Sequence, residues 1–124
     1  MIAGVGVDIV RIGRMEKSLG SEAFWQRVFG EEERAFLEKL APARRAASAA
    51  ANFAAKEAFL KACGKGLGGF ALADIQVLRA ESGAPYYALE GAAAAHIAEN
   101  GLHVSLSLSH EDGLAAAFAV LEKG

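Results

Sequence analysis

Residues 43–63 have the sequence ARRAASAAANFAAKEAFLKAC, which is the strongest helix signal in the chain. It is rich in alanine, contains neither glycine nor proline, and is followed at once by Gly64. Alanine has the highest helix propensity of all residues, and glycine commonly occupies the position just after a helix C-terminus. We therefore predict a long helix over 43–63, around which the other elements are arranged.

The segment before this helix predicts one strand and several short helices. Residues 2–10 (IAGVGVDIV) alternate small and β-branched side chains, which is typical of a strand. Residues 13–29 have helical spacing, interrupted at Gly20, where Ser21 can serve as a new N-cap. A further amphipathic helix is predicted over Glu31–Leu40 and is expected to stop near the next proline.

The segment after the long helix begins with a glycine-rich loop, GKGLGGF, and then alternates short strands with one helix. The elements predicted there are strands over Ile75–Arg79 and Tyr86–Leu89 around a Gly-Ala-Pro turn, a helix over Gly91–Asn100, and strands over His103–Ser109 and Leu114–Leu121. This order favours an α+β fold, in which a small antiparallel sheet packs with helices, over a parallel doubly wound sheet.

Composition limits the class of protein. A length of 124 residues predicts one domain spanning 1–124, and 13 Lys+Arg against 15 Asp+Glu argue against a nucleic-acid binder. The single Cys63 excludes a disulfide framework and a multi-cysteine zinc site. No apolar run is long enough to cross a membrane, and the N-terminus lacks the cationic start of a signal peptide, so we expect a cytoplasmic protein.

The apolar residues are small. Hydrophobic residues make up 53% of the chain, but 28 of its residues are alanine, which buries little area. The chain has few large apolar side chains with which to form a hydrophobic core by itself. Other subunits are therefore expected to complete part of it.

Glu57 and Lys61 are the first candidates for chemistry. Residues four apart on a helix share one face, so the pair can be an ordinary surface ion pair. Lys56 lies beside Glu57, and the glycine-rich loop follows directly. A carboxylate able to hold a metal, a lysine one turn away and a flexible backbone cradle are what a phosphate-bearing ligand needs.

Asp8 is the second candidate. A carboxylate in an apolar strand can simply cap the next turn, but Gly4 and Gly6 before it allow another backbone to approach closely. GVGVD lacks the third glycine of a dinucleotide fingerprint. If Asp8 and Glu57 converge, two hard carboxylates suit Mg²⁺.

Two further segments carry weaker signals. Ser107–Glu111 (SLSHE) contains His110, but the sequence lacks G-x-S-x-G and offers no acid at a telling spacing, so a hydrolase triad is disfavoured. Arg44 and Arg45 stand at the N-terminus of the long helix, where the helix dipole disfavours cations. They are either solvated surface residues or a site for an anionic ligand.

Taken together and in order, four segments resemble one family over nearly the whole chain. GVGVDIVRIGRM (4–15), FAAKEAFLKACGKGLG (53–68), GAP (83–85) and SLSHEDGLAAAFAVLE (107–122) are similar to the holo-acyl-carrier-protein synthases, small bacterial phosphopantetheinyl transferases. The resemblance implies the phosphopantetheinyl transferase fold. It also implies transfer of 4′-phosphopantetheine from coenzyme A to a serine of apo acyl carrier protein, with release of 3′,5′-ADP, in fatty acid biosynthesis.

The resemblance also implies roles for individual residues. Asp8 and Glu57 would bind Mg²⁺, Glu57 would serve removal of the serine proton, and Lys61 would neutralise a pyrophosphate oxygen. The residues implied at the coenzyme A site, besides Lys61, are Arg44, Arg45, Gly64, Gly66, Pro85, Ser109 and His110.

Assembly and partner contacts are implied in the same way. The family is homotrimeric, so the group of Asp8, Glu57 and Lys61 would meet the region of Pro85 and His110 of a neighbouring subunit. The implied contacts to the acidic recognition helix of the carrier protein are Arg14, with Arg11 and Arg27 in the same patch.

The sequence departs from the family pattern at three positions. Asn52 stands where arginine is common, Ala84 where lysine is frequent in the turn, and Glu111 where a hydroxyl residue is frequent. We expect weaker coenzyme A binding than in a relative with those bases. Two other functions stay open: a phosphopantetheinyl transferase for a polyketide or peptide synthetase carrier, and a non-enzymatic carrier-binding module.

Overall fold

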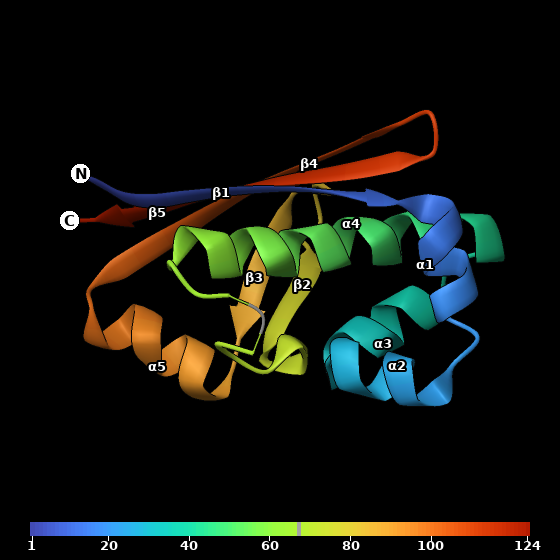
Figure 1. The fold of residues 1–124 in the computed structure, drawn as a ribbon, viewed down its shortest axis with the longest axis horizontal. Coiled ribbons are helices and arrows are strands. Elements are labelled where there is room, and N and C mark those ends of the chain that lie inside the picture. Colours follow the sequence, from blue (N-terminus) through green and yellow to red (C-terminus); the bar gives the residue numbers. More distant parts are fainter. Residues whose placement is uncertain (67) are drawn as a thin grey trace.

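The alanine-rich segment forms the central helix α4, Pro42–Ala62, in the computed structural model, which describes residues 1–66 and 68–124 (Figure 1). Pro42 begins the helix at a position where its missing N–H costs nothing. At the other end Gly64 has φ of 71°, its amide donates to Lys61 O, and the amide of Lys65 donates to Leu60 O. These two bonds form a Schellman motif, which confirms that Gly64 terminates the helix.

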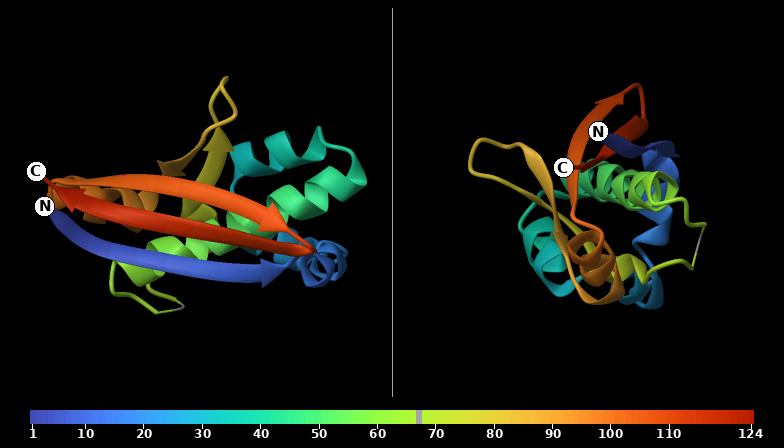
Figure 2. Two further views of the ribbon diagram at one scale, coloured as in Figure 1. Left: turned by 90° about the horizontal axis from the view of Figure 1, so that it is seen from above. Right: turned by 90° about the vertical axis from the view of Figure 1, so that its left-hand side faces the viewer.

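A three-stranded antiparallel sheet runs along one side of α4 (Figures 1 and 2). The strands are β1 (Ile2–Arg11), β4 (Leu102–Glu111) and β5 (Leu114–Lys123), in the order β1-β5-β4. Asp112 and Gly113 join β4 to β5 with positive φ values of 50° and 76°, as expected of a two-residue Asp-Gly hairpin turn. The two chain ends are neighbours, because the amide of Lys123 donates to Met1 O.

Small side chains let α4 lie very close to this sheet. On β5, Ala115, Ala117 and Ala119 are buried toward the helix. On β1, a methyl group on Gly4 or Gly6 would overlap a carbonyl oxygen of α4. The many alanines are therefore not a shortage of core. They are the packing surface between one helix and one sheet.

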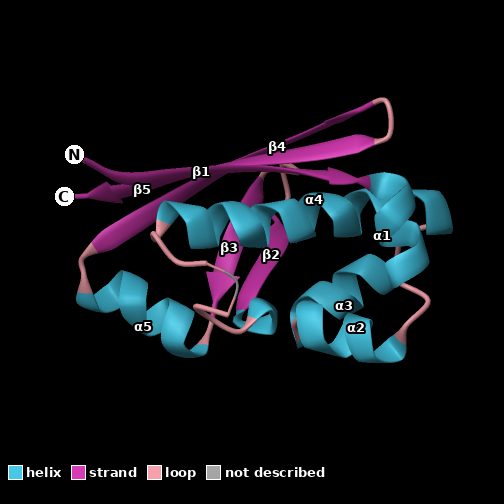
Figure 3. Ribbon diagram, viewed as in Figure 1, coloured by secondary structure: helices cyan, strands magenta, loops and turns pink. Residues whose placement is uncertain are grey.

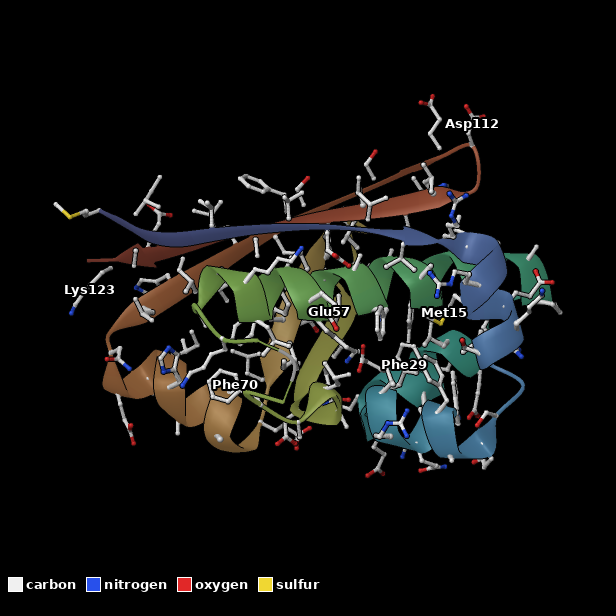
Figure 4. The ribbon with its side chains drawn as sticks, viewed as in Figure 1. Met15, Phe29, Glu57, Phe70, Asp112 and Lys123 are labelled. Carbon is white, nitrogen blue, oxygen red and sulfur yellow. The ribbon has the colours of Figure 1, made fainter. Side chains whose placement is uncertain are left out.

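Three short helices cover the N-terminal end of α4 (Figure 1). They are α1 (Ile12–Ser18), α2 (Glu22–Val28) and α3 (Glu31–Glu38). The break predicted at Gly20 is present, and Ser21 Oγ accepts the amide of Phe24 at 3.2 Å as the N-cap of α2. The bulky core residues gather beneath α4 here, among them Met15, Val28, Phe29 and Leu37 (Figure 4).

A separate hairpin crosses behind α4 and contacts β4 of the large sheet (Figure 3). It consists of β2 (Ile75–Arg79) and β3 (Pro85–Leu89), and it is preceded by a single 3₁₀ turn, η1 (Leu72–Asp74). Helix α5 (Gly91–Glu99) then leads into β4. The α+β prediction is confirmed, with two small antiparallel sheets instead of one. Within the described residues, no helix is long and apolar enough to cross a membrane.

Candidate functional site

A cavity of about 700 Å³ lies between β1, α1, α2 and α4. Asp8 and Glu57 both line it, although they are far apart in the sequence. Its apolar wall includes Met15, Phe24 and Phe53. Figure 4 shows Glu57 midway along α4, with Met15 toward the α1 end. The predicted convergence of the two carboxylates on one cavity is therefore present.

Lys61 completes this cluster of three charged residues. Its Nζ lies 3.3 Å from Asp8 Oδ1 and donates to the carbonyl oxygen of Val7 at 2.9 Å. The Lys61 side chain is 54% exposed and that of Asp8 21%, so the pair faces solvent and is open to a ligand. Glu57 and Lys61 share one face of α4, but Lys61 pairs with β1 and not with Glu57.

Glu57 is the residue of the cluster whose carboxylate has, within the described part of the chain, an unsatisfied buried oxygen. Among the described residues none bonds to its Oε1, although that oxygen is buried. Burial raises the pKa of Glu57, the negative charge of Asp8 raises it further, and Lys61 lowers it. A buried carboxylate oxygen without a donor, next to a second carboxylate, is a fitting ligand set for a hard divalent cation such as Mg²⁺.

The Pro85 and His110 region lies on another side of α4. His110 lines a hollow of about 170 Å³ together with Arg79, Ser48 and Leu108. Pro85 stands opposite Arg79 in the β2–β3 pairing, whereas Ser109 points to the exposed outer face of the large sheet. Glu57 and Ser48 are nine residues apart, hence about 13.5 Å along the axis and on opposite faces of α4. One chain thus carries two separate groups of candidate site residues, here called half-sites.

The two arginines at the start of α4 differ in their surroundings. Arg44 is exposed. Arg45 donates from Nε to Leu37 O and from Nη2 to the carbonyl oxygens of Glu38 and Leu40, at 3.0–3.1 Å. Arg45 therefore caps the C-terminus of α3, where a cation also complements the helix dipole. Of the two, Arg44 is the one left free for an anionic ligand.

The loop predicted to pass a diphosphate is only partly placed. Gly64 and Gly66 are both exposed, and a methyl on either would meet no atom within 4 Å. Leu67, which is part of the predicted Gly64–Gly68 loop, lies outside the described residues.

The basic residues predicted to contact a carrier protein fall into two groups. Arg11 and Arg14 line the large cavity beside Asp8. Arg27 is exposed on α2 but does not line that cavity.

Lys56, the lysine beside Glu57, is not available to an external phosphate. Its side chain is fully buried, and Nζ lies 2.6 Å from Glu33 Oε1 while also donating to the carbonyl oxygens of Leu72 and Ile75. Burial lowers the pKa of Lys56, and the negative charge of Glu33 opposes that shift. The periodicity of α4 alone could have warned of this, because Lys56 is one residue away from the face of Glu57.

Asn52 is buried too, so its effect on coenzyme A cannot be that of a surface residue. Its Nδ2 donates to Glu33 Oε2 and to Val77 O, both at 3.0 Å, and its Oδ1 accepts from Arg79 at 2.8 Å. Arg79 is the site residue that sequence reasoning missed, since an arginine at a strand end carries no local signal.

Comparisons with known proteins agree with this arrangement. The model of the 4′-phosphopantetheinyl transferase superfamily matches residues 4–119. A holo-[acyl-carrier-protein] synthase of Treponema denticola is 43% identical over 98% of this chain and 99% of the relative. One from Clavibacter michiganensis is 43% identical over 98% of this chain and 97% of its own.

Solved structures agree as well. The holo-(acyl-carrier-protein) synthase of Bacillus anthracis, in complex with coenzyme A (3′,5′-ADP), is 35% identical with a TM-score of 0.85 over 100% of this chain and 99% of that one. The holo-ACP synthase of Plasmodium yoelii is 30% identical with a TM-score of 0.86, covering 100% and 97%. The chain belongs to the holo-[acyl-carrier-protein] synthase family of 4′-phosphopantetheinyl transferases.

Proposed function

We propose that this protein transfers 4′-phosphopantetheine from coenzyme A to a serine of apo acyl carrier protein, in a Mg²⁺-dependent reaction that serves fatty acid biosynthesis in the cytoplasm. The observation that carries the proposal is that Asp8 and Glu57 line one cavity and that Lys61 pairs with Asp8 beside it. The relative from Bacillus anthracis, which is named as a complex with coenzyme A, supports the donor.

The reaction exchanges one phosphorus–oxygen bond for another. The serine oxygen bonds to the phosphorus that carries pantetheine, and the bond from that phosphorus to the bridging oxygen breaks. The electron pair leaves with 3′,5′-ADP, and the serine proton must be accepted by a base. Such transfers depend on positioning and charge neutralisation more than on covalent chemistry by the protein.

Asp8 and Glu57 would hold Mg²⁺, because they offer two oxygen ligands and one of those oxygens is unpaired. When bound, the ion supplies positive charge to the pyrophosphate of coenzyme A. Glu57 would also serve removal of the serine proton. Lys61, which is held near Asp8 yet exposed, can turn its ammonium toward the departing phosphate oxygen.

Two features support a homotrimer with sites between subunits. His110 and Glu57 belong to different half-sites, on opposite sides of α4. The outer face of the large sheet is apolar and exposed at Val5, Val7, Ile9 and Phe118. Exposed apolar faces of this kind mark contacts between proteins. Packing these faces together would place the His110 half-site of one copy near the Glu57 half-site of the next.

The carrier protein would approach the large cavity. Arg11 and Arg14 at its edge suit acidic side chains, and Met15 and Phe24 suit an apolar side chain between them. Arg27 on the neighbouring helix α2 would extend the basic surface. A docked helix could then present its serine to Glu57.

Mass spectrometry tests the function directly. The protein is incubated with coenzyme A, MgCl₂ and apo acyl carrier protein, and in parallel with apo carrier domains of a polyketide and a peptide synthetase. A phosphopantetheine mass gain on the acyl carrier protein is expected. Gain only on a synthetase domain would assign the other carrier class. Absence of gain on all three would support a non-enzymatic binding module and overturn the proposal.

A further inference from the structure

The hollow beside His110 is lined by a positively charged side chain, that of Arg79, to which the proposed reaction gives no role. Arg79, the last residue of β2, lines this hollow together with His110 and Ser48. In the described part of the chain its guanidinium makes no ion pair. Burial lowers the pKa of Arg79, which shows how poorly its charge is solvated, while Glu33 opposes the shift.

The side chain of Arg79 is nevertheless held in place. Nη2 donates to Asn52 Oδ1 at 2.8 Å, and the guanidinium stacks 5.3 Å from the ring centre of Phe36. Asn52 is itself fixed by the bonds of its Nδ2 to Glu33 and Val77. The hydrogen bonds of Asn52 therefore hold its neutral amide oxygen against the guanidinium of Arg79. A carboxylate in that position would have neutralised the positive charge, but the amide does not. Nη1 of Arg79 also donates to the carbonyl oxygen of Leu78, at 3.4 Å. Both acceptors are neutral, so the positive charge of the guanidinium is not compensated by either of them.

A fixed arginine without a counter-ion in a hollow suits a phosphate. The guanidinium offers planar paired donors that match phosphate oxygens, and an anion that binds it offsets the cost of the half-buried charge. The pyrophosphate of coenzyme A is already assigned to the half-site of Asp8, Glu57 and Lys61. The second anionic group of coenzyme A is the phosphate monoester on its 3′ oxygen.

Resting on the proposed function, we propose that Arg79 binds the 3′-phosphate of coenzyme A in the hollow that it shares with His110, and so selects coenzyme A over 3′-dephospho-coenzyme A. In this chain Asn52 stands where the family commonly has arginine, and the residue bonded to Asn52 is Arg79. The positive charge missing at position 52 is therefore supplied from β2, at nearly the same place.

The test compares kcat/KM for coenzyme A and for 3′-dephospho-coenzyme A in wild type, Arg79→Gln and Arg79→Lys, with apo acyl carrier protein as acceptor. Wild type is expected to prefer coenzyme A by about 10- to 100-fold, as a charged hydrogen bond is lost without the phosphate. Arg79→Gln should lose that preference through a higher KM for coenzyme A, with kcat/KM for the dephospho donor within about twofold of wild type. Arg79→Lys should keep part of the preference.

Lys39→Gln is the matched control, because Lys39 is exposed and its loss changes the net charge equally. It should keep the full preference for coenzyme A. An unchanged preference in Arg79→Gln, or a wild type that uses both donors equally, would overturn the proposal. So would a loss of preference in Arg44→Gln alone. If Arg79→Gln does not fold, Arg79→Lys decides, and wild-type preference and KM in that variant would count against the assignment. A wild type without any transfer activity would refute the proposed function instead.

Discussion

Gly6 of β1 lies directly against Ala58 of α4: a methyl group on Gly6 would overlap the carbonyl oxygen of Ala58 and stand 2.8 Å from the amide nitrogen of Ala62. Because Gly6 carries no side chain toward the helix, the contact lets the backbone of α4 approach the backbone of β1 closely. Asp8 follows Gly6 by two residues on the same face of β1, and Glu57 precedes Ala58 directly. The same contact therefore brings the two carboxylates of the candidate site together.

Gly6→Ala is expected to destabilise the fold by about 3 kcal/mol or more, because the obstructing atoms are backbone and cannot rotate away. Urea denaturation measures the loss. Gly13→Ala is the matched control, since a methyl there meets nothing within 4 Å, and in a helix it should stabilise by about 0.5–1 kcal/mol. Equal midpoints for Gly6→Ala and wild type would contradict the close packing.

Lys56→Met is expected to cost about 3–5 kcal/mol, because it leaves the buried carboxylate of Glu33 without its cation. The double variant Lys56→Met/Glu33→Gln should recover part of that loss, since the uncompensated charge is gone. Glu32→Gln, an exposed neighbour on the same helix, should change stability by less than about 0.5 kcal/mol. A Lys56→Met protein as stable as wild type would rule out the ion pair as a structural element.

Glu57→Gln is expected to abolish transfer while raising the melting temperature of the metal-free protein at neutral pH. A carboxylate whose pKa is raised in the folded state destabilises that state when it is ionised, and the amide removes this charge. Differential scanning fluorimetry with and without MgCl₂ measures both effects. Mg²⁺ should stabilise wild type and leave Glu57→Gln unchanged.

The exposed Glu16→Gln on α1 serves as control for Glu57→Gln and should behave as wild type in both assays. Full transfer activity in Glu57→Gln, or equal stabilisation of that variant by Mg²⁺, would remove Glu57 from the metal site.

Val7→Asp is expected to turn a trimer into monomers in sedimentation velocity, with the far-UV circular dichroism retained. Val7 is 55% exposed and pairs across the strands with Phe118, which is 46% exposed, so the charge would lie in the proposed interface and not in the core. Ala95→Asp, which adds the same charge on an exposed position of α5, should leave the trimer intact. A wild type that sediments as a monomer would contradict the assembly.

Mixing two inactive variants tests whether sites are shared. Glu57→Gln and His110→Ala impair different half-sites, so trimers that contain both subunits would hold some sites with intact Glu57 from one copy and intact His110 from another. Co-expressed subunits should therefore regain part of the transfer activity. No regain, with mixed trimers confirmed by native mass spectrometry, would place both residues in the site of a single chain.

Local chemistry explains why much of the fold could be predicted. The long helix, its end at Gly64, the break before Ser21 and the closing pair of strands all depend on propensities and turn residues within a few positions. The 3₁₀ turn η1 was not anticipated, and Pro42 begins α4 where it was expected mainly to stop the preceding helix. The start of α4 at Pro42 nevertheless has a local cause, because proline is favoured in the first turn of a helix.

The candidate site divides in the same way. Asp8, Glu57 and Lys61 were identified by residue type and spacing. Once β1 lies beside α4, Asp8 and Glu57 line one cavity and Lys61 pairs with Asp8. Arg45 was predicted at the coenzyme A site because a sequence displays charge but not burial, and the burial of Lys56 was not anticipated for the same reason. Their partners, Glu33 for the lysine and the carbonyl groups of α3 for the arginine, come from other helices.

Residue type and short-range order were enough to predict most of the elements, the family resemblance and the two carboxylates that we propose as ligands of Mg²⁺. Only the tertiary structure decided which charges are free to act. It buried Lys56 against Glu33, used Arg45 as a helix cap and left Arg79 beside His110 with a neutral partner. The physical reason is that the availability of a charge depends on its solvation and on the groups that face it, and both are set by contacts between residues distant in the chain.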